Sequence, residues 1–470
     1  GAVTTFAGGG GNFGSTDGFG TTARFNQPRG LVIDRAGNLF VGDSVNNTVR
    51  RITPAGIVST FAGAAGVIGY TDGAAASSRF GLPYGLAIDG NDKLFVVDQI
   101  YNAIRSITAG EVRTYVGIPS TTPGSADGGL TTARFNFPAF VAVDRDGNVY
   151  VSDAFNHTIR KVSTTGQTTT LAGLAGTTGS ADGPGTVARF FQPSGLVCDA
   201  AGNVFVADFG NSTIRRITPN GEVSTFAGLA GATGTNDATG SAARFQNPEG
   251  IAIDAAGNFF VSDSNNHMVR RITPAGAVTT IGGQSTNFGV AAGTFTSAQF
   301  FLPSGIAVDG GGAVYVVSSY GNVIMRGQLD TRPIITVQPQ AHDVLAGATA
   351  TLSVGATGGG LRYQWKRNGT VILGATNGSH TATNVAAANA GDYTVDVTNS
   401  AGVTASAPAT LRLVTTADVG RITNLAIRSQ AGTGSSERLT RIPTVGFRSR
   451  RSATRSASAS SSRWSSWIVA

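Results

Sequence analysis

The chain has 470 residues, which is enough for two or three domains. Glycine is abundant, with 66 residues, and only 13% of the residues are charged, a composition typical of a β-rich protein with many tight turns. The single cysteine, Cys198, excludes an internal disulfide framework, and no apolar run reaches the roughly 20 residues of a membrane-spanning helix.

The basic character of the chain is confined to its end. Residues 415–470 hold nine arginines and two acids, which equals the net charge of +7 of the whole chain, so residues 1–414 are neutral. A neutral body argues against nucleic-acid binding by this part of the chain. The chain starts at Gly1 without a signal-like segment, which we interpret as processing or truncation.

A 55-residue repeat organises residues 1–328. Each repeat carries a marker proline, and an aspartate follows each proline six positions later. The prolines are Pro28, Pro83, Pro138, Pro193, Pro248 and Pro303. A fixed period of this length indicates a repeat architecture.

Each repeat contains four short β patterns, which in the first repeat cover residues 30–33, 39–42, 48–52 and 58–62. The first two are joined by residues 34–38, with a glycine at the fourth position of the turn. This position predicts a type I turn followed by a left-handed residue. The second repeat has Asp92 there, which tolerates the left-handed conformation better than most residues.

The two ends of the repeat region complement each other. The last repeat supplies three strand patterns and ends near Arg326, while residues 1–8 match residues 276–283, the fourth pattern of the preceding repeat. Four-stranded antiparallel units repeated around an axis make a β-propeller, and closure leaves no exposed first or last edge. We therefore predict an all-β, six-bladed propeller closed by the N-terminal strand.

The repeat also carries a family resemblance. The pattern Phe-Asn-x-Pro-x-Gly-x-x-x-Asp-x-x-Gly-Asn-x-Phe/Tyr-Val-x-Asp, followed by Asn-x-x-Ile-Arg-x-Ile and Val-Thr-Thr-Phe-Ala-Gly, resembles the NHL repeat, and its long-loop variant is similar to teneurin-type propellers. The resemblance covers residues 1–328. It implies an extracytoplasmic bacterial protein, secreted or on the cell surface.

Residues 329–414 form a second predicted domain, in which the 55-residue markers are absent. Strand patterns cover residues 350–354, 361–366, 393–397 and 410–414. The segment 363–366 resembles the tryptophan-bearing strand of an immunoglobulin-like β-sandwich, and the segment 390–395 resembles its tyrosine corner. That resemblance implies a disulfide between the positions of Val354 and Val395, so here we expect a hydrophobic contact. Trp365 is expected in the core.

Residues 415–470 form the third predicted segment. A strand-like pattern at residues 420–425 gives way, from about Ser435, to a run of arginine and serine that cannot bury a core. We interpret the segment as a degenerate or truncated domain that is largely disordered. An arm that binds an anionic polymer is the functional alternative.

Repeated polar residues have both a structural and a functional interpretation. Asp17 and Asp43 recur in five repeats, and so does Arg24. A ring of carboxylates for cations is the functional reading. We favour the structural one, because a binding site needs convergence at one place: the acids cap their own loops, and the Arg24-type residues pair with them.

His157 and His267 occupy a repeat position that holds Asn47 and Asn102 in the first two repeats, so we expect them to share the asparagines' turn role. We predict no metal site and no cofactor. Cys198 is in register with Ile33 and Ile253, and we interpret it as a buried apolar residue rather than a nucleophile. The sequence contains no nucleophile elbow, no phosphate-binding loop and no Cys/His pair placed for nucleophilic work, so no catalytic residue is predicted.

Positions that vary between repeats are the better candidates for binding. The residue after each marker proline begins the innermost strand, and the residues after the second aspartate lie on the same predicted face. From these positions we predict a ligand-binding face. Its residues are Arg29, Tyr84, Glu249, Ile100, Tyr101, Phe155, Phe209, Asn265 and Tyr320.

The function we predict is non-catalytic binding or adhesion. The propeller face would hold a protein or glycan ligand at the cell envelope, and we expect a monomer without a membrane span. The alternative is a metal-dependent propeller enzyme of the lactonase or lyase class, with its site at the channel mouth. A third reading, RNA binding through a basic face, conflicts with the neutral charge of residues 1–414.

Overall fold

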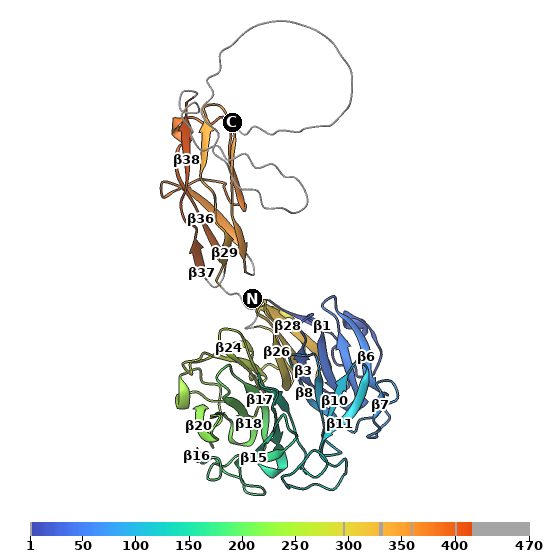
Figure 1. Ribbon diagram of the computed structural model, residues 1–470. Coiled ribbons are helices and arrows are strands. Elements are labelled where there is room, and N and C mark those ends of the chain that lie inside the picture. Colours follow the sequence, from blue (N-terminus) through green and yellow to red (C-terminus); the bar gives the residue numbers. More distant parts are fainter. Residues whose placement is uncertain (1, 295–296, 329–331, 359–360, 400–401, 416–470) are drawn as a thin grey trace, which may run out of the picture. The chain divides into compact units, whose positions relative to one another are not determined.

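The structure is a computed structural model that describes residues 2–294, 297–328, 332–358, 361–399 and 402–415. It is built from β-strands joined by turns and one-turn 3₁₀ helices. The chain divides into two compact units, unit 1 (Gly1–Thr331) and unit 2 (Arg332–Ala470), which are described separately (Figure 1). The prediction of a disordered, degenerate tail falls on residues 415–470, nearly all of which lie outside the described residues.

Unit 1 contains six antiparallel sheets, one for each 55-residue repeat, and we number them first to sixth in sequence order. In each, the strand after the marker proline is innermost. The first sheet contains β3 (Pro28–Ile33), β4 (Leu39–Asp43), β5 (Thr48–Ile52), β6 (Ile57–Gly63) and β2 (Gly18–Phe19). The second contains β8 (Pro83–Ile88), β9 (Leu94–Asp98), β10 (Ala103–Thr108), β11 (Glu111–Val116) and β7 (Gly73–Ala74). The third contains β12 (Val141–Val143), β13 (Val149–Asp153), β14 (Thr158–Val162) and β15 (Thr168–Gly173).

The other three sheets follow the same order. The fourth contains β17 (Pro193–Cys198), β18 (Val204–Asp208), β19 (Thr213–Ile217), β20 (Glu222–Ala227) and β16 (Gly183–Pro184). The fifth contains β21 (Pro248–Ile253), β22 (Phe259–Asp263), β23 (Met268–Ile272) and β24 (Val278–Gly283). The sixth contains β26 (Pro303–Val308), β27 (Ala313–Ser318), β28 (Val323–Gln328), β1 (Ala2–Ala7) and β25 (Gly293–Thr294). The 3₁₀ helices are η1 (Gly20–Thr22), η2 (Ser44–Asn46), η3 (Ala154–Asn156), η4 (Phe209–Asn211), η5 (Gly240–Ala242) and η6 (Ser264–Asn266).

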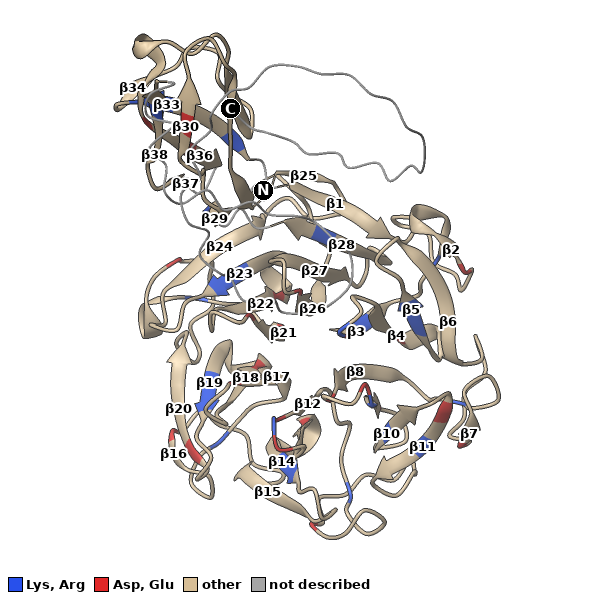
Figure 2. Ribbon diagram, turned by 45° about the horizontal axis from the view of Figure 1, so that its top comes forward, with Lys and Arg blue, Asp and Glu red and all other residues tan. Residues whose placement is uncertain are grey.

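The six innermost strands surround a common centre, as Figure 2 shows. Each contacts the innermost strand of the next sheet, and the cycle closes where β26 of the sixth sheet contacts β3 of the first. The sixth sheet joins the two ends of the repeat region. In it β1 pairs antiparallel with β28, with Thr5 opposite Met325. The predicted pairing of the N-terminal residues with the strand that ends near Arg326 is confirmed.

Glycine permits the close approach of these innermost strands. A Cβ atom on Gly30 would clash with the carbonyl oxygen of Tyr84 in the next sheet, and one on Gly195 would clash with that of Glu249. The third repeat has Phe140 where the first repeat has Gly30, and its innermost strand is shortened to Val141–Val143. The symmetry of the ring is therefore broken at the third sheet.

A buried arginine holds each of the first five sheets together. Arg50 is fully buried, and its Nη1 atom donates to Asp43 at 2.8 Å and to the backbone carbonyl of Arg24 at 2.9 Å. Its Nη2 atom bonds Asp17 in the preceding loop, and its guanidinium lies 5.2 Å from the ring centroid of Phe25. We call this arrangement the arginine clamp. Its central residues are Arg50, Arg105, Arg160, Arg215 and Arg270.

The clamp corrects one sequence prediction. The acids do serve a structural role, but Arg24, which was expected to pair with them, instead donates to the backbone carbonyls of Thr21, Thr22 and Ala23. The partner is the strand residue Arg50, because its side chain starts inside the sheet and reaches both carboxylates. In the sixth sheet Met325 and Ser318 replace the clamp arginine and the strand aspartate, and both are buried.

The described residues of unit 2 form three sheets. The largest contains β30 (His342–Leu345), β38 (Ala409–Val414), β36 (Gly391–Asn399), β33 (Arg362–Arg367), β34 (Thr370–Val371) and β37 (Gly402–Ala405). The two-stranded sheets are β31 (Ala350–Ser353) with β35 (Ser379–Ala382), and β29 (Ile334–Val337) with β32 (Gly355–Thr357); η7 covers Ala387–Asn389. Trp365 is fully buried in the core, as expected, and Val354 and Val395 belong to the same hydrophobic cluster. The Tyr393 hydroxyl donates to the backbone carbonyl of Asn389 at 2.7 Å.

The clamp generates a stability prediction for the second sheet. Arg105→Met leaves Asp98 buried without its charge partner, so we expect the free energy of unfolding to fall by about 3–5 kcal/mol. The double variant Arg105→Met/Asp98→Ser copies the residues of the sixth sheet and should recover most of this loss. Urea unfolding followed by circular dichroism measures both variants.

The control is Arg113→Ala, since Arg113 pairs with Glu111 on the exposed surface of the same sheet. It should change stability by no more than about 0.5 kcal/mol. An Arg105→Met variant as stable as this control would contradict the role of the clamp.

Candidate functional site

One face of unit 1 is built from loops that all follow the second strand of a sheet. In five of the six repeats the strand ends at an aspartate, and in four of these a 3₁₀ turn and a left-handed residue follow. The left-handed residues at this position are Asn47, Asn102, His157, Ser212, His267 and Asn322. The Nδ1 atom of His157 accepts a hydrogen bond from the backbone N–H of Gln192, and Asn102 accepts one from Phe137 in the same way. The histidines therefore share the turn role of the asparagines, which confirms that interpretation.

The residues after the marker prolines differ in size around the ring. Arg29, Tyr84 and Glu249 are large, whereas Ala139 and Ser194 are small, and Ser304 donates to the backbone carbonyl of Arg29 at 3.1 Å. The large side chains come from the first, second and fifth sheets, and Arg29 and Tyr84 both contact Glu249. The small ones, from the third and fourth sheets, leave space beside them.

Glu249 is the centre of a polar cluster. Its side chain is 5% exposed, and its Oε1 atom accepts hydrogen bonds from the Tyr84 hydroxyl at 2.8 Å and from Nη1 of Arg29 at 3.3 Å. Its Oε2 atom accepts from the Ser264 hydroxyl at 3.4 Å. The guanidinium of Arg29 also lies 5.4 Å from the ring centroid of Tyr84 and 5.8 Å from that of Tyr320.

The cluster carries no net charge at neutral pH. Burial by itself would lower the pKa of Arg29, but the nearby Tyr84 and Glu249 outweigh it and raise this pKa. Burial, and then the charge of Glu249, raise the pKa of Tyr84. Arg29 is therefore cationic and Tyr84 is a neutral hydroxyl that donates to the carboxylate.

A cavity of about 280 Å³ opens beside this cluster. Arg29, Tyr84 and Glu249 form one side, and Phe155 and Phe209 contribute aromatic walls. The remaining lining residues are Gln99, Ala139, Ala154, Gln192, Pro193 and Ser194. Aromatic rings beside a few convergent polar groups are typical of a ligand site. We call it the mouth cavity.

Five of the nine residues predicted for the binding face line the mouth cavity, and Tyr320 contacts one of them. The other three lie elsewhere. Tyr101 packs against Tyr70 with ring centroids 4.9 Å apart, Ile100 is half-buried beside it, and the Asn265 side chain donates to Asn247 at 2.8 Å on the exposed surface.

Sequence reasoning did not select Gln99 or Gln192. Gln192 comes immediately before a marker proline, and Gln99 follows the second aspartate. The signal that could have found them is the pair Ala139 and Ser194, because these small residues follow the marker prolines of two successive repeats and the cavity lies beside them.

The mouth cavity offers few ligands for a metal ion. The described residues contain no group of three or more histidine, cysteine or acidic side chains that could hold a metal ion. Glu249 is the one acid among the mouth-cavity residues, and both of its oxygens already accept hydrogen bonds. This donor set does not fit a divalent cation.

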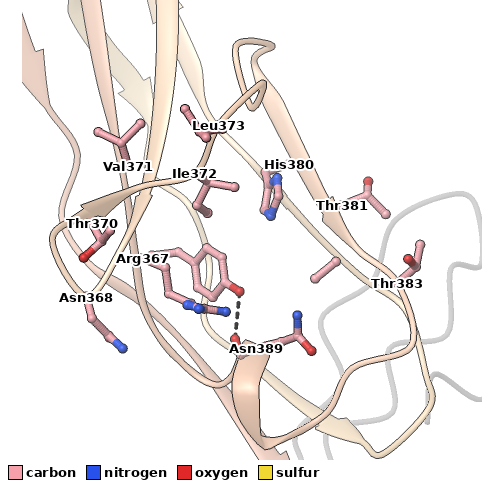
Figure 3. Close-up of a pocket in the computed structure, with 12 residues that line it drawn as sticks. Arg367, Asn368, Thr370, Val371, Ile372, Leu373, His380, Thr381, Thr383 and Asn389 are labelled. Atoms are coloured by element: carbon pink, nitrogen blue, oxygen red, sulfur yellow. Dashed lines mark hydrogen bonds between the residues drawn. The ribbon is translucent and has the colours of Figure 1, made fainter.

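Unit 2 also contains a cavity, of about 630 Å³ (Figure 3). It lies between the ends of two different sheets, with Val371 of β34 on one side and Thr381 of β35 on the other. The buried Tyr393 is one of its lining residues, and its hydroxyl donates to the backbone carbonyl of Asn389. Because Tyr393 is part of the hydrophobic core of unit 2, we place the candidate site in unit 1.

Comparisons with known proteins support the repeat assignment. Residues 130–240 match the family model "SMP-30/Gluconolactonase/LRE-like region", and residues 245–272 match the NHL repeat. The chain is 27% identical over 323 residues to Protein SUPPRESSOR OF QUENCHING 1, chloroplastic, of Arabidopsis thaliana, a match that covers 64% of this chain and 30% of that protein. It is 26% identical over 339 residues to human NHL repeat-containing protein 2, covering 53% of this chain and 46% of that protein. The chain thus spans less than half of either relative.

Solved structures show the same fold at low sequence identity. A structural genomics protein of unknown function from Bacteroides thetaiotaomicron matches with a TM-score of 0.55 and 21% identity, over 69% of this chain and 75% of that one. An auxiliary nutrient binding protein from the same species matches with a TM-score of 0.53 and 16% identity, over 69% and 75% of the two chains. The chain therefore contains an NHL repeat and a gluconolactonase-like region within an all-β, propeller-like fold. Among the helices of the described residues, none is long and apolar enough to span a membrane.

Cys198 provides a prediction about reactivity. It is half-buried at the end of β17, and burial raises the pKa of its thiol to about 12. At pH 8 the folded protein should react with iodoacetamide slower than the urea-unfolded chain by roughly a thousandfold, because almost no thiolate is present. In the folded protein the rate should continue to rise with pH beyond 9. Mass spectrometry of this single cysteine measures both states, and a plateau below pH 9 would contradict the raised pKa.

Proposed function

We propose that residues 1–328 are a six-bladed NHL-type propeller of the long-loop kind, that residues 329–414 are an immunoglobulin-like sandwich, and that residues 415–470 are a separate degenerate segment. The closed cycle of innermost strands supports six blades. The buried Trp365 and the tyrosine-corner bond of Tyr393 support the sandwich.

The function that the geometry supports best is non-catalytic binding of a protein or glycan ligand by the propeller. The observation that carries this proposal is the mouth cavity, where Phe155 and Phe209 face a neutral, hydrogen-bonded cluster centred on Glu249. Aromatic faces contribute area, and the convergent polar groups give orientation and specificity. Because the charges of Arg29 and Glu249 neutralise each other, the site favours a ligand without net charge.

The solved relatives give limited further support. The neighbour from Bacteroides thetaiotaomicron with a TM-score of 0.53 is described as an auxiliary nutrient binding protein, and capture of an external ligand by this chain would be a comparable role. We accordingly propose an extracytoplasmic location, with unit 2 serving as a spacer or adhesion module. Fold likeness alone does not define a ligand, so the proposal depends on the cavity.

A metal-dependent lactonase or lyase is the second candidate, and it is favoured by the gluconolactonase-like match of residues 130–240. The single engaged carboxylate at the mouth argues against it. Elemental analysis of the purified full chain separates the two candidates. If the protein binds its ligand without catalysis, we expect clearly less than one metal ion per chain. One tightly held divalent ion per chain would favour the enzyme.

Two substitutions test the binding proposal, and each introduces the residue that another repeat has at the equivalent position. Ser194→Tyr copies Tyr84 at the equivalent position, and Phe155→Asn copies Asn265. We expect each variant of the full chain to lose about tenfold or more in affinity, because one blocks the cavity and the other removes an aromatic wall. Binding is measured on arrays of neutral glycans and of cell-envelope proteins.

Asn265→Val is the matched control, because it copies Val45 and lies outside the mouth cavity. It should bind like the unmodified chain. Equal binding by all of these variants would contradict the site.

A further inference from the structure

A line of aromatic side chains leads away from the mouth cavity through loops of the fifth and sixth repeats. The ring centroids of Tyr320 and Phe301 are 5.7 Å apart, those of Phe301 and Phe288 are 5.3 Å apart, and those of Phe288 and His267 are 4.5 Å apart. Phe288 is 52% exposed and Tyr320 is 44% exposed. We call these four residues the aromatic track.

The fold does not require these aromatic rings. The fifth repeat has Thr233, Gln246 and Asn265 at the positions of Phe288, Phe301 and Tyr320, and it forms the same loops. In both repeats the glycine after the first of these positions donates its backbone N–H to the carbonyl of the buried phenylalanine eleven residues further along the chain. Only the sixth repeat has aromatic residues at all three positions. An exposed apolar patch that the fold does not need indicates an interaction surface.

The track is continuous with the mouth cavity through Arg29. Its guanidinium lines the cavity and also lies 5.8 Å from the ring centroid of Tyr320. The track is uncharged as well: burial lowers the pKa of His267, and its Nδ1 atom accepts a hydrogen bond from the backbone N–H of Leu302. A ligand that runs from the cavity along the track therefore meets aromatic faces and no net charge.

The size of the mouth cavity limits what it can enclose. At about 280 Å³ it lies just below the range typical of small-molecule sites, which is roughly 300–1,000 Å³, so it holds one small unit of a longer ligand. A neutral sugar unit suits both parts, because a pyranose has an apolar C–H face that packs on an aromatic ring and a rim of hydroxyls that donate and accept hydrogen bonds. A flat protein surface would not enter the cavity.

We propose that the ligand is a neutral oligosaccharide or polysaccharide, with one terminal unit in the mouth cavity and the following units on the aromatic track formed by Tyr320, Phe301, Phe288 and His267. This inference rests on the proposed binding function and extends it. It specifies that the ligand is a carbohydrate, that this ligand is uncharged, and that it is longer than one sugar unit.

The test uses the full chain and calorimetric titration with neutral oligosaccharides of one to six units derived from cellulose, laminarin, mannan and xylan. For the series that binds, affinity should increase by about tenfold between one and four units, because additional rings are covered. The double variant Phe288→Thr/Phe301→Gln copies the fifth repeat at two track positions, leaves Tyr320 beside Arg29 in place, and should remove most of this increase. Its affinity for the single sugar should stay unchanged, because neither residue lines the mouth cavity.

Tyr70→Ser is the matched control, since Tyr70 is an exposed aromatic residue of another repeat and serine stands at the equivalent position in three repeats. It should keep the full dependence on length. A double variant that binds long and short probes like the unmodified chain would overturn the track while leaving the mouth cavity intact. If no neutral sugar of any length binds and a cell-envelope protein does, the glycan assignment itself is wrong.

Discussion

The arginine clamp is the interaction on which unit 1 depends. A guanidinium with no solvent exposure bridges a fully buried strand aspartate and a half-exposed loop aspartate, and it packs on the ring of a buried phenylalanine. Burying such an ion pair has a large desolvation cost, so its value lies in fixing the position of the long loop relative to the sheet. Because this arrangement is repeated five times, the loops that carry the variable residues stand on a rigid base.

The sixth sheet lacks the arginine clamp and has a different closing arrangement. Met325 and Ser318 replace its charged residues, and the N-terminal strand β1 pairs with β28, so that the start and the end of the repeat region share one sheet. The loops of the same repeat carry the aromatic side chains of Phe301 and Tyr320. Loss of the repeated polar network and gain of exposed aromatic residues coincide there, which is what a specialised repeat in an otherwise regular ring would show.

Much of this architecture could be predicted from the sequence, because its cause is local and repeated. The spacing of the marker prolines, the left-handed turn glycine of residues 34–38 and the match of the N-terminal residues to a fourth strand all depend on short-range chemistry. The partner of the repeated acids was predicted wrongly, since Arg24 and Arg50 are both repeated and sequence spacing does not say which one points into the sheet. The mouth cavity was predicted in part: Arg29, Tyr84 and Glu249 were selected for variability, but their mutual contacts depend on closure of the ring.

The central claim is that small residues in the third and fourth repeats open a neutral ligand site beside Glu249. The most direct measurement is a crystal structure of the full chain with the neutral oligosaccharide that binds it best. The account predicts a sugar ring between Phe155 and Phe209, within hydrogen-bond distance of Gln99, Gln192 or Glu249, and further units directed towards Tyr320. A sugar bound only outside the mouth cavity, or a cavity closed by its own side chains in the presence of the sugar, would contradict it.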